Sequence, residues 1–392
     1  MSHMRGRILN LPKNVFILGL TSFFNDFSSE MVFAVFPAFF TSVLEAGAAS
    51  LGLVDGLAEA ASNFFKLYSG LLSDRIKSRK PLVIAGYALS VASRPFYMFV
   101  STVSGALGLR FLDRVGKGLR DPARDALISF STSKEEYGRS FGYHRAMDTT
   151  GAILGPLVAY LILRTFPLHF NTIFVTAFII GLCAVATLFF VTDIATNRQA
   201  AWSIGTGTFS WRFKLYLLSI FVLSVGSLPV AVILLKSESL GLLIADIPLF
   251  YMVYNVSYAL FSLPAGRASD RFGAPVVIVI GYLFMLAGYA AIAIAGSVWT
   301  LAFGFLILGF FPALTDGVQR SYASLLSTEE TRGKGLGWLQ AAVGFGALLA
   351  GIGGGWLWQA FGPTLAFECA GAIVILGLIL FIASSSRDTD KP

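Results

Sequence analysis

The sequence predicts an all-α integral membrane protein built as two six-helix bundles related by a pseudo-two-fold axis. Hydrophobic residues make up 56% of the 392 residues, charged residues make up 13%, and the mean hydropathy is +0.74. Soluble proteins carry about 25% charged residues. The apolar residues also fall into runs of about 20 or more, long enough to cross a bilayer. Finally, one six-residue motif recurs at corresponding places in the two halves of the chain.

Twelve apolar runs can be placed along the chain. The first six cover residues 14–42, 50–70, 81–101, 104–130, 139–163 and 168–192. The second six cover residues 213–235, 243–265, 275–296, 298–326, 334–360 and 363–384. We therefore expect an N-terminal bundle over 1–192, a more polar linker over 193–212 and a C-terminal bundle over 213–392. An even number of crossings places both termini on the same side of the membrane.

The basic residues indicate which side that is. Lys and Arg concentrate in one set of loops: Arg5, Arg7, Lys13, Arg75, Lys77, Arg79, Lys80, Lys134, Arg139, Arg198, Arg212, Arg267, Arg271, Arg332 and Arg387. The opposite set carries little beyond Arg164 and Lys236. By the positive-inside rule, both termini are cytoplasmic and the protein belongs in the inner (cytoplasmic) membrane. The net charge of +7 therefore reflects membrane topology, and we expect no nucleic-acid partner.

The recurring motif is Gly-x-x-Ser-Asp-Arg. It runs from Gly70 to Asp74 and Arg75 after the second span, and from Gly266 to Asp270 and Arg271 after the eighth. The two halves are therefore parallel repeats, which is typical of carriers that enclose a solute site at the interface of two bundles.

These residues carry a resemblance to the major facilitator superfamily over nearly the whole chain. The stretch from Gly70 through Asp74 and Arg75 to Arg79 is similar to the family signature after the second helix, although Lys77-Ser78 replaces its second glycine. The copy from Gly266 through Asp270 to Arg271 is closer to the pattern. The resemblance implies a role for both loops in a cytoplasmic gate.

The fifth span contains a second signature. Gly142, Gly151, Gly155 and Pro156 match the spacing of the antiporter motif of this family, and the final glycine pair departs from it. Glycines at such intervals let helix backbones approach closely. The resemblance favours export by proton exchange.

Ionisable residues inside the spans predict a polar interior in the first half. The fourth span places five of them on one helix face, which must avoid lipid because charged groups there cost about 2.5–3.5 kcal/mol each: Arg110, Arg114, Lys117, Asp121 and Arg124. Neighbouring spans add Asp26, Glu30, Asp55, Glu59, Lys66, Arg94, His144, Arg145 and Asp148. The second half is sparser, and we expect an aromatic wall there from Phe250, Tyr251, Tyr254, Tyr258 and Trp338.

We assign hypothetical roles to these groups. The candidates for proton coupling are Asp26, Glu30 and Asp148, because a gate that changes the exposure of a carboxyl group near an arginine can change its proton occupancy. The candidates for solute binding or counter-charge are Arg110, Arg114, Arg145, Asp55, Glu59 and Tyr254. Structural ion pairing is the alternative for each of them, and we favour it for Asp113, Arg120 and Asp125. Arg114 with Gly118 is also similar to a family signature associated with proton movement.

The sequence thus predicts a proton-coupled secondary transporter of a small organic solute that works by alternating access, with anionic and zwitterionic solutes as the candidates. Import of an anionic nutrient or a siderophore-like metal chelate is the main alternative. A multidrug exporter or a non-transporting membrane sensor ranks lower. His3, His144 and His169 are scattered, and no Walker sequence is present; we therefore expect neither an enzyme nor a metal or cofactor. We expect a monomer in the lipid bilayer.

Overall fold

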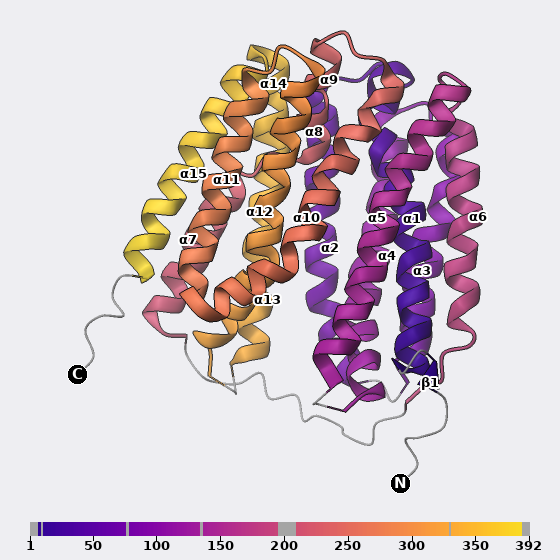
Figure 1. Ribbon diagram of the computed structural model, residues 1–392, viewed down its shortest axis with the longest axis vertical. Helices are drawn as coiled ribbons and strands as arrows, with labels where there is room; N and C mark the ends of the chain where they lie inside the picture. The colour runs from indigo at the N-terminus through magenta and orange to yellow at the C-terminus, as the bar shows by residue number, and fades with distance from the viewer. Residues whose placement is uncertain are drawn as a thin grey trace.

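The computed structural model describes residues 7–8, 11–75, 78–133, 136–194, 209–328 and 331–385. A two-residue hairpin, β1 (Arg7–Ile8) with β2 (Leu11–Pro12), precedes the first helix. The long helices run side by side, with the early helices on one side of the molecule and the late ones on the other (Figure 1). The expected all-helical membrane fold is confirmed. Most of the expected linker, residues 195–208, lies outside the described residues.

Each of the twelve predicted spans corresponds to one helix or to two or three consecutive helical segments. The first six are α1 (Lys13–Ser42), α2 (Ala48–Arg75), α3 (Lys80–Ser93) continued by η1 (Arg94–Phe99), α4 (Val103–Ser131), α5 (Tyr137–Thr165) and α6 (Phe170–Leu188). The second six begin with α7 (Trp211–Val225) and α8 (Val230–Leu234), followed by the short α9 (Lys236–Ser239) and η3 (Ile244–Asp246). They continue with α10 (Ile247–Phe272), α11 (Ala274–Ala293), α12 (Val298–Leu325), α13 (Arg332–Leu349), the π-helical η4 (Ala350–Gly354), α14 (Gly355–Phe361) and α15 (Pro363–Ser385).

The seventh span is interrupted, which the sequence analysis did not predict. Helix α7 ends at Val225, and Pro229 precedes α8. The hydroxyl of Tyr289 fills the break, because it accepts a hydrogen bond from the Leu228 backbone N–H (2.8 Å) and donates one to the Gly226 carbonyl (3.2 Å). Backbone groups freed inside a membrane need such partners.

Three of the twelve helices are unusually polar. Among the described residues, nine segments are long and apolar enough to cross a membrane by length and composition. Helices α1, α2 and α4 fall outside that group, and they carry most of the ionisable residues of the first half. They run alongside the other helices in Figure 1. Their charged faces must therefore be turned toward protein or water rather than lipid.

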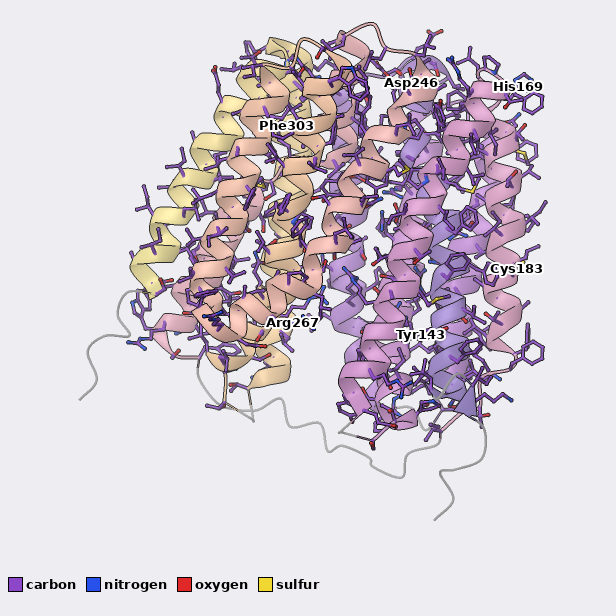
Figure 2. All side chains as sticks on the ribbon, viewed as in Figure 1. Tyr143, His169, Cys183, Asp246, Arg267 and Phe303 are labelled. Atoms are coloured by element: carbon purple, nitrogen blue, oxygen red, sulfur yellow. The ribbon has the colours of Figure 1, made fainter. Side chains whose placement is uncertain are left out.

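The helices define two ends of the molecule. Helix α1 begins and α15 ends at the lower end in Figure 1, which we call the terminal end. The opposite end, the far end, holds Asp246 and His169 in Figure 2. The early helices contact the late ones mainly where α2 packs on α13, η4 and α14, and where α5 packs on α10.

The two halves close against each other at the far end. The Thr41 hydroxyl donates a hydrogen bond to Glu238 Oε1 (2.7 Å), and the Ala49 backbone N–H donates one to Gln359 Oε1 (3.0 Å). Between these contacts, the backbones of α2 and η4 meet directly: a Cβ added to Gly351 would contact the Gly52 carbonyl oxygen and lie 2.8 Å from the Gly56 Cα.

Candidate functional site

A cavity of about 1160 Å³ lies between the halves. Side chains from α1, α2, α4, α5, α10, α12 and α13 line it. It reaches the terminal end, where Gly70, Phe141, Asp270 and Gly333 form part of its wall. Because direct contacts between the halves close the far end, the cavity formed by the described residues opens toward the terminal end.

A pair of carboxyl groups lines the cavity between α1 and α5. The Asp26 and Asp148 carboxyl groups lie close enough for a hydrogen bond between their side chains. Two ionised carboxylates can only accept hydrogen bonds, so a hydrogen bond between them requires a proton on one of the two groups. The remaining oxygens are also engaged: the Asn25 amide donates to Asp26 Oδ1 (2.9 Å) and the Ser22 hydroxyl to Asp148 Oδ1 (2.7 Å). Arg145 forms an ion pair with Asp148 Oδ2 (3.2 Å).

A buried arginine positions Asn25, the residue that donates a hydrogen bond to Asp26. Arg94 at the start of η1 is 2% exposed and donates a hydrogen bond to Asn25 Oδ1 (2.9 Å). It also bonds to the Ser28 hydroxyl. Because Arg94 occupies the Asn25 oxygen, the Asn25 amide nitrogen faces Asp26. The sequence showed Arg94 as an ionisable residue in the third span but gave no indication of this role.

Two contacts cross from the acidic wall to the second half. The Tyr251 hydroxyl of α10 donates a hydrogen bond to Glu30 Oε2 (2.6 Å). The Arg145 guanidinium lies over the Tyr258 ring, 4.9 Å from its centroid, and the Tyr258 hydroxyl donates to Asp316 Oδ2 (3.0 Å). All three predicted proton-coupling residues therefore line the cavity, together with Arg145.

The opposite wall is basic. Glu59 and Arg114 line the cavity as the sequence analysis expected of solute-binding groups, and Lys66 and Lys117 lie beside them. Glu59 is within electrostatic range of all three cations. Tyr254 also lines the cavity and stacks on Tyr251, with ring centroids 5.9 Å apart.

Two predicted solute-binding residues lie elsewhere. Arg110 and Asp55 are not among the cavity-lining residues; they form an ion pair with each other (3.0 Å). The Arg110 guanidinium is 3% exposed and lies over the Phe33 ring, 4.6 Å from its centroid. In this conformation the geometry contradicts direct solute contact by either residue, because the space around them is already filled.

The predicted aromatic wall is correct in part. Tyr251, Tyr254 and Tyr258 line the cavity. Phe250, however, is buried against Phe305, with centroids 5.8 Å apart. Trp338 is 57% exposed and forms part of an apolar surface pocket between α7 and α13. Both were wrongly placed, since they face neighbouring helices or lipid.

Two of the three predicted packing glycines of the fifth span lie in close helix contacts, and the third does not. A Cβ on Gly151 would lie 2.8 Å from the Phe27 backbone nitrogen, and one on Gly155 would lie 2.7 Å from the Phe27 carbonyl oxygen. These two glycines therefore allow the close packing of α5 on α1 that was expected, with Pro156 buried beside them. Gly142 has open space around it, so the expectation of close packing there was wrong.

The repeated motif lies at the open end of the cavity. Gly70, Gly266 and Asp270 line the cavity, and Arg271 is exposed. Arg79 is buried with its guanidinium 4.8 Å from the centroid of the Phe130 ring. The side chains of Asp74 and Arg75 lie outside the described residues. Within the described ranges no hydrogen bond or ion pair joins Asp270 to the first half, as expected where the halves have separated.

Comparisons with known proteins identify the family. A sequence model of the Major Facilitator Superfamily matches residues 18–218 and 215–392. An uncharacterised MFS-type transporter of Methanocaldococcus jannaschii is 34% identical, covering 95% of this chain and 95% of that protein. The chain belongs to the major facilitator superfamily.

More distant relatives agree with this assignment. Multidrug resistance protein MdtH of Cronobacter sakazakii is 25% identical, covering 84% of this chain and 83% of that protein. The crystal structure of a mutant of the nucleoside transporter NupG has the same fold, with a TM-score of 0.80 at 14% identity over 95% of this chain and 99% of that one. As a member of the major facilitator superfamily, the protein is a multi-pass secondary transporter of a small molecule and not an enzyme.

Proposed function

We propose that this transporter couples the movement of protons to that of a small organic solute with an anionic or zwitterionic group, by alternating access. The observation that carries the proposal is the close approach of the Asp26 and Asp148 carboxyl groups in the wall of the cavity, where the pair can take up and release a proton. Buried carboxyl groups are costly in a membrane and are usually functional.

The surroundings of the pair suggest how a proton could bias the two conformations. Arg145 is held by Asp148 on one side and by the Tyr258 ring of the second half on the other. A proton taken up by the Asp26–Asp148 pair reduces the negative charge that faces Arg145, which changes the contact between the halves. A ligand shifts an equilibrium only through such differential contacts.

The basic loops support an orientation with the terminal end in the cytoplasm, so the cavity described here is open inward. The Gly151–Gly155 packing of α5 and the similarity to multidrug resistance proteins support export as the direction of transport. The protein would act as a monomer in the cytoplasmic membrane.

Solute-induced proton flux tests the proposal. The purified protein is reconstituted into liposomes loaded with a pH-sensitive dye, and organic acids, amino acids, nucleotides and drugs are added in turn. We expect at least one solute to change the internal pH and to exchange with labelled solute across the membrane. If a solute shows such exchange but moves no protons, the coupling is refuted; if a solute passes without acceleration by solute on the opposite side, the protein is a channel.

A pH dependence is expected at the far end. Burial raises the pKa of the Glu238 carboxyl, and the hydrogen bond from Thr41 opposes this rise. Opening the far end hydrates the Glu238 carboxyl group and returns its pKa toward the ordinary value. The closed conformation therefore binds the Glu238 proton more tightly than the open one. Closure is therefore favoured at pH values below the raised pKa and weakens as pH rises through it. Glu238→Gln should remove this dependence.

Distance measurements between spin labels on Ser101→Cys and Gly296→Cys, with Cys183 and Cys369 replaced by alanine, report the far-end separation. Asp246→Asn is the matched control, a carboxylate of the same end that does not line the cavity. An unchanged pH response in Glu238→Gln would contradict the assignment.

A further inference from the structure

Three cations on α2 and α4 face the cavity together. On α2, Glu59, Asn63 and Lys66 are spaced by four and three residues, so they share a helix face. On α4, Arg114 and Lys117 are three residues apart and likewise share a face. All five residues line the cavity, and Asn63 is the one that is almost fully buried, at 3% exposed.

A glycine brings the two helices into contact at this point. A Cβ on Gly118 would lie 2.7 Å from the Ser62 carbonyl oxygen and 3.1 Å from the Lys66 backbone nitrogen. The Ser69 hydroxyl also bonds to the Leu119 carbonyl oxygen. The backbones next to Lys66 and Lys117 are thus fixed against each other by direct packing, which places both ammonium groups at the same part of the cavity wall.

These cations differ from four arginines of the same half in lacking ion pairs. Arg110, Arg120, Arg124 and Arg145 each lie within 4.0 Å of a carboxylate. Across the described residues, no ion pair of that length involves Lys66, Arg114 or Lys117. Glu59 is a counter-charge shared by all three cations, and Asp121 and Asp113 are further counter-charges for Lys66 and Arg114, respectively. Their hydrogen-bond donors are therefore not taken up by a direct carboxylate partner and can bind a solute that enters the cavity.

We infer that Lys66, Arg114 and Lys117 form a binding site for an oxyanion group of the solute, a phosphate or carboxylate. Arg offers a planar fork for two parallel hydrogen bonds and each Lys adds a compact charge, a combination suited to such groups. The inference rests on the proposed function and names the chemistry of its solute. It assigns roles to Lys66 and Lys117, which the sequence analysis left without one.

The second half can contact the same solute. Gln340 of α13 and Arg320 of α12 line the cavity, and Arg320 takes part in no ion pair among the described residues. Helix α13 approaches α2 beside the cluster, since a Cβ on Gly344 would lie 3.0 Å from the Asn63 Cβ. A solute held by the cluster could therefore touch both halves, as alternating access requires.

Anion binding to the purified full-length protein in detergent tests the inference. Inorganic phosphate, pyrophosphate and citrate are titrated at constant ionic strength, with chloride as the compensating anion, by thermal unfolding and isothermal titration calorimetry. We expect at least one of them to raise the melting temperature above the chloride reference. The phosphate and citrate arms distinguish a phosphate-selective site from a carboxylate-selective one.

Matched variants locate the binding. Lys66→Gln and Lys117→Gln should each raise the dissociation constant of the anion about tenfold, because each removes a charge-assisted hydrogen bond. Lys66→Arg keeps the charge and should bind within about threefold of the wild type, which also controls for misfolding of the Gln variant. Arg164→Gln removes an exposed cation outside the cavity and should have no effect.

The inference is overturned if none of the three anions stabilises the protein. It is also overturned if Arg164→Gln loses as much anion affinity as the Lys66→Gln and Lys117→Gln variants. Because this experiment uses no pH gradient and none of the carboxyl variants, its failure is separate from failure of the proton coupling proposed above.

Discussion

Gly351→Val is expected to abolish transport and hold the far end open. The added Cβ would meet the Gly52 carbonyl oxygen and the Gly56 Cα, both backbone atoms of α2 that cannot rotate away. The helices must therefore separate by about 1 Å, and overpacking of this kind costs roughly 1–3 kcal/mol. Because alternating access needs the far end to close, we expect solute flux to fall at least tenfold and the distance between labels on Ser101→Cys and Gly296→Cys to increase.

Gly353→Val is the matched control, since it places the same side chain in the same π-helical segment where a Cβ would meet nothing within 4 Å. It should transport within about twofold of the wild type. Gly351→Ala adds only the clashing Cβ and should give an intermediate effect, which separates a specific block from misfolding. Wild-type transport by Gly351→Val would contradict the closed far end described here.

Asp26→Asn and Asp148→Asn should each lower solute accumulation driven by a pH gradient at least tenfold. Asn keeps the size and an accepting oxygen, so the hydrogen bonds from Asn25 and Ser22 can remain. It cannot release a proton, however, and the shared hydrogen bond no longer stores one. Accumulation in reconstituted liposomes measures the effect, with Asp246→Asn as the control carboxylate at the far end. Equal accumulation in both variants and the wild type would remove the pair from the mechanism.

Much of the fold follows from the sequence because lipid imposes a simple rule: each crossing needs a long apolar run. That rule placed all twelve spans. It did not predict the break after Val225, which depends on the hydroxyl of Tyr289, far away in the chain. Tertiary contacts of this kind leave no local signal.

The candidate site was predictable to the level of a helix face. Arg110 and Arg114 lie on the same face of α4, and periodicity cannot separate them. Only Arg114 lines the cavity, because Phe33 and Asp55 cover Arg110. Lys66 and Lys117 were visible at helical spacing from Glu59 and Arg114. Their shared location depends on Gly118, whose packing partner a single sequence does not reveal.

Comparing solute exchange with proton-driven accumulation in Asp26→Asn tests the central claim most directly. Exchange of labelled for unlabelled solute at equal pH needs the halves to alternate but needs no net proton movement. We predict that the variant keeps exchange within about threefold of the wild type and loses accumulation under an imposed pH gradient. Accumulation by Asp26→Asn at the wild-type level, alongside normal exchange, would contradict proton coupling through the Asp26–Asp148 pair.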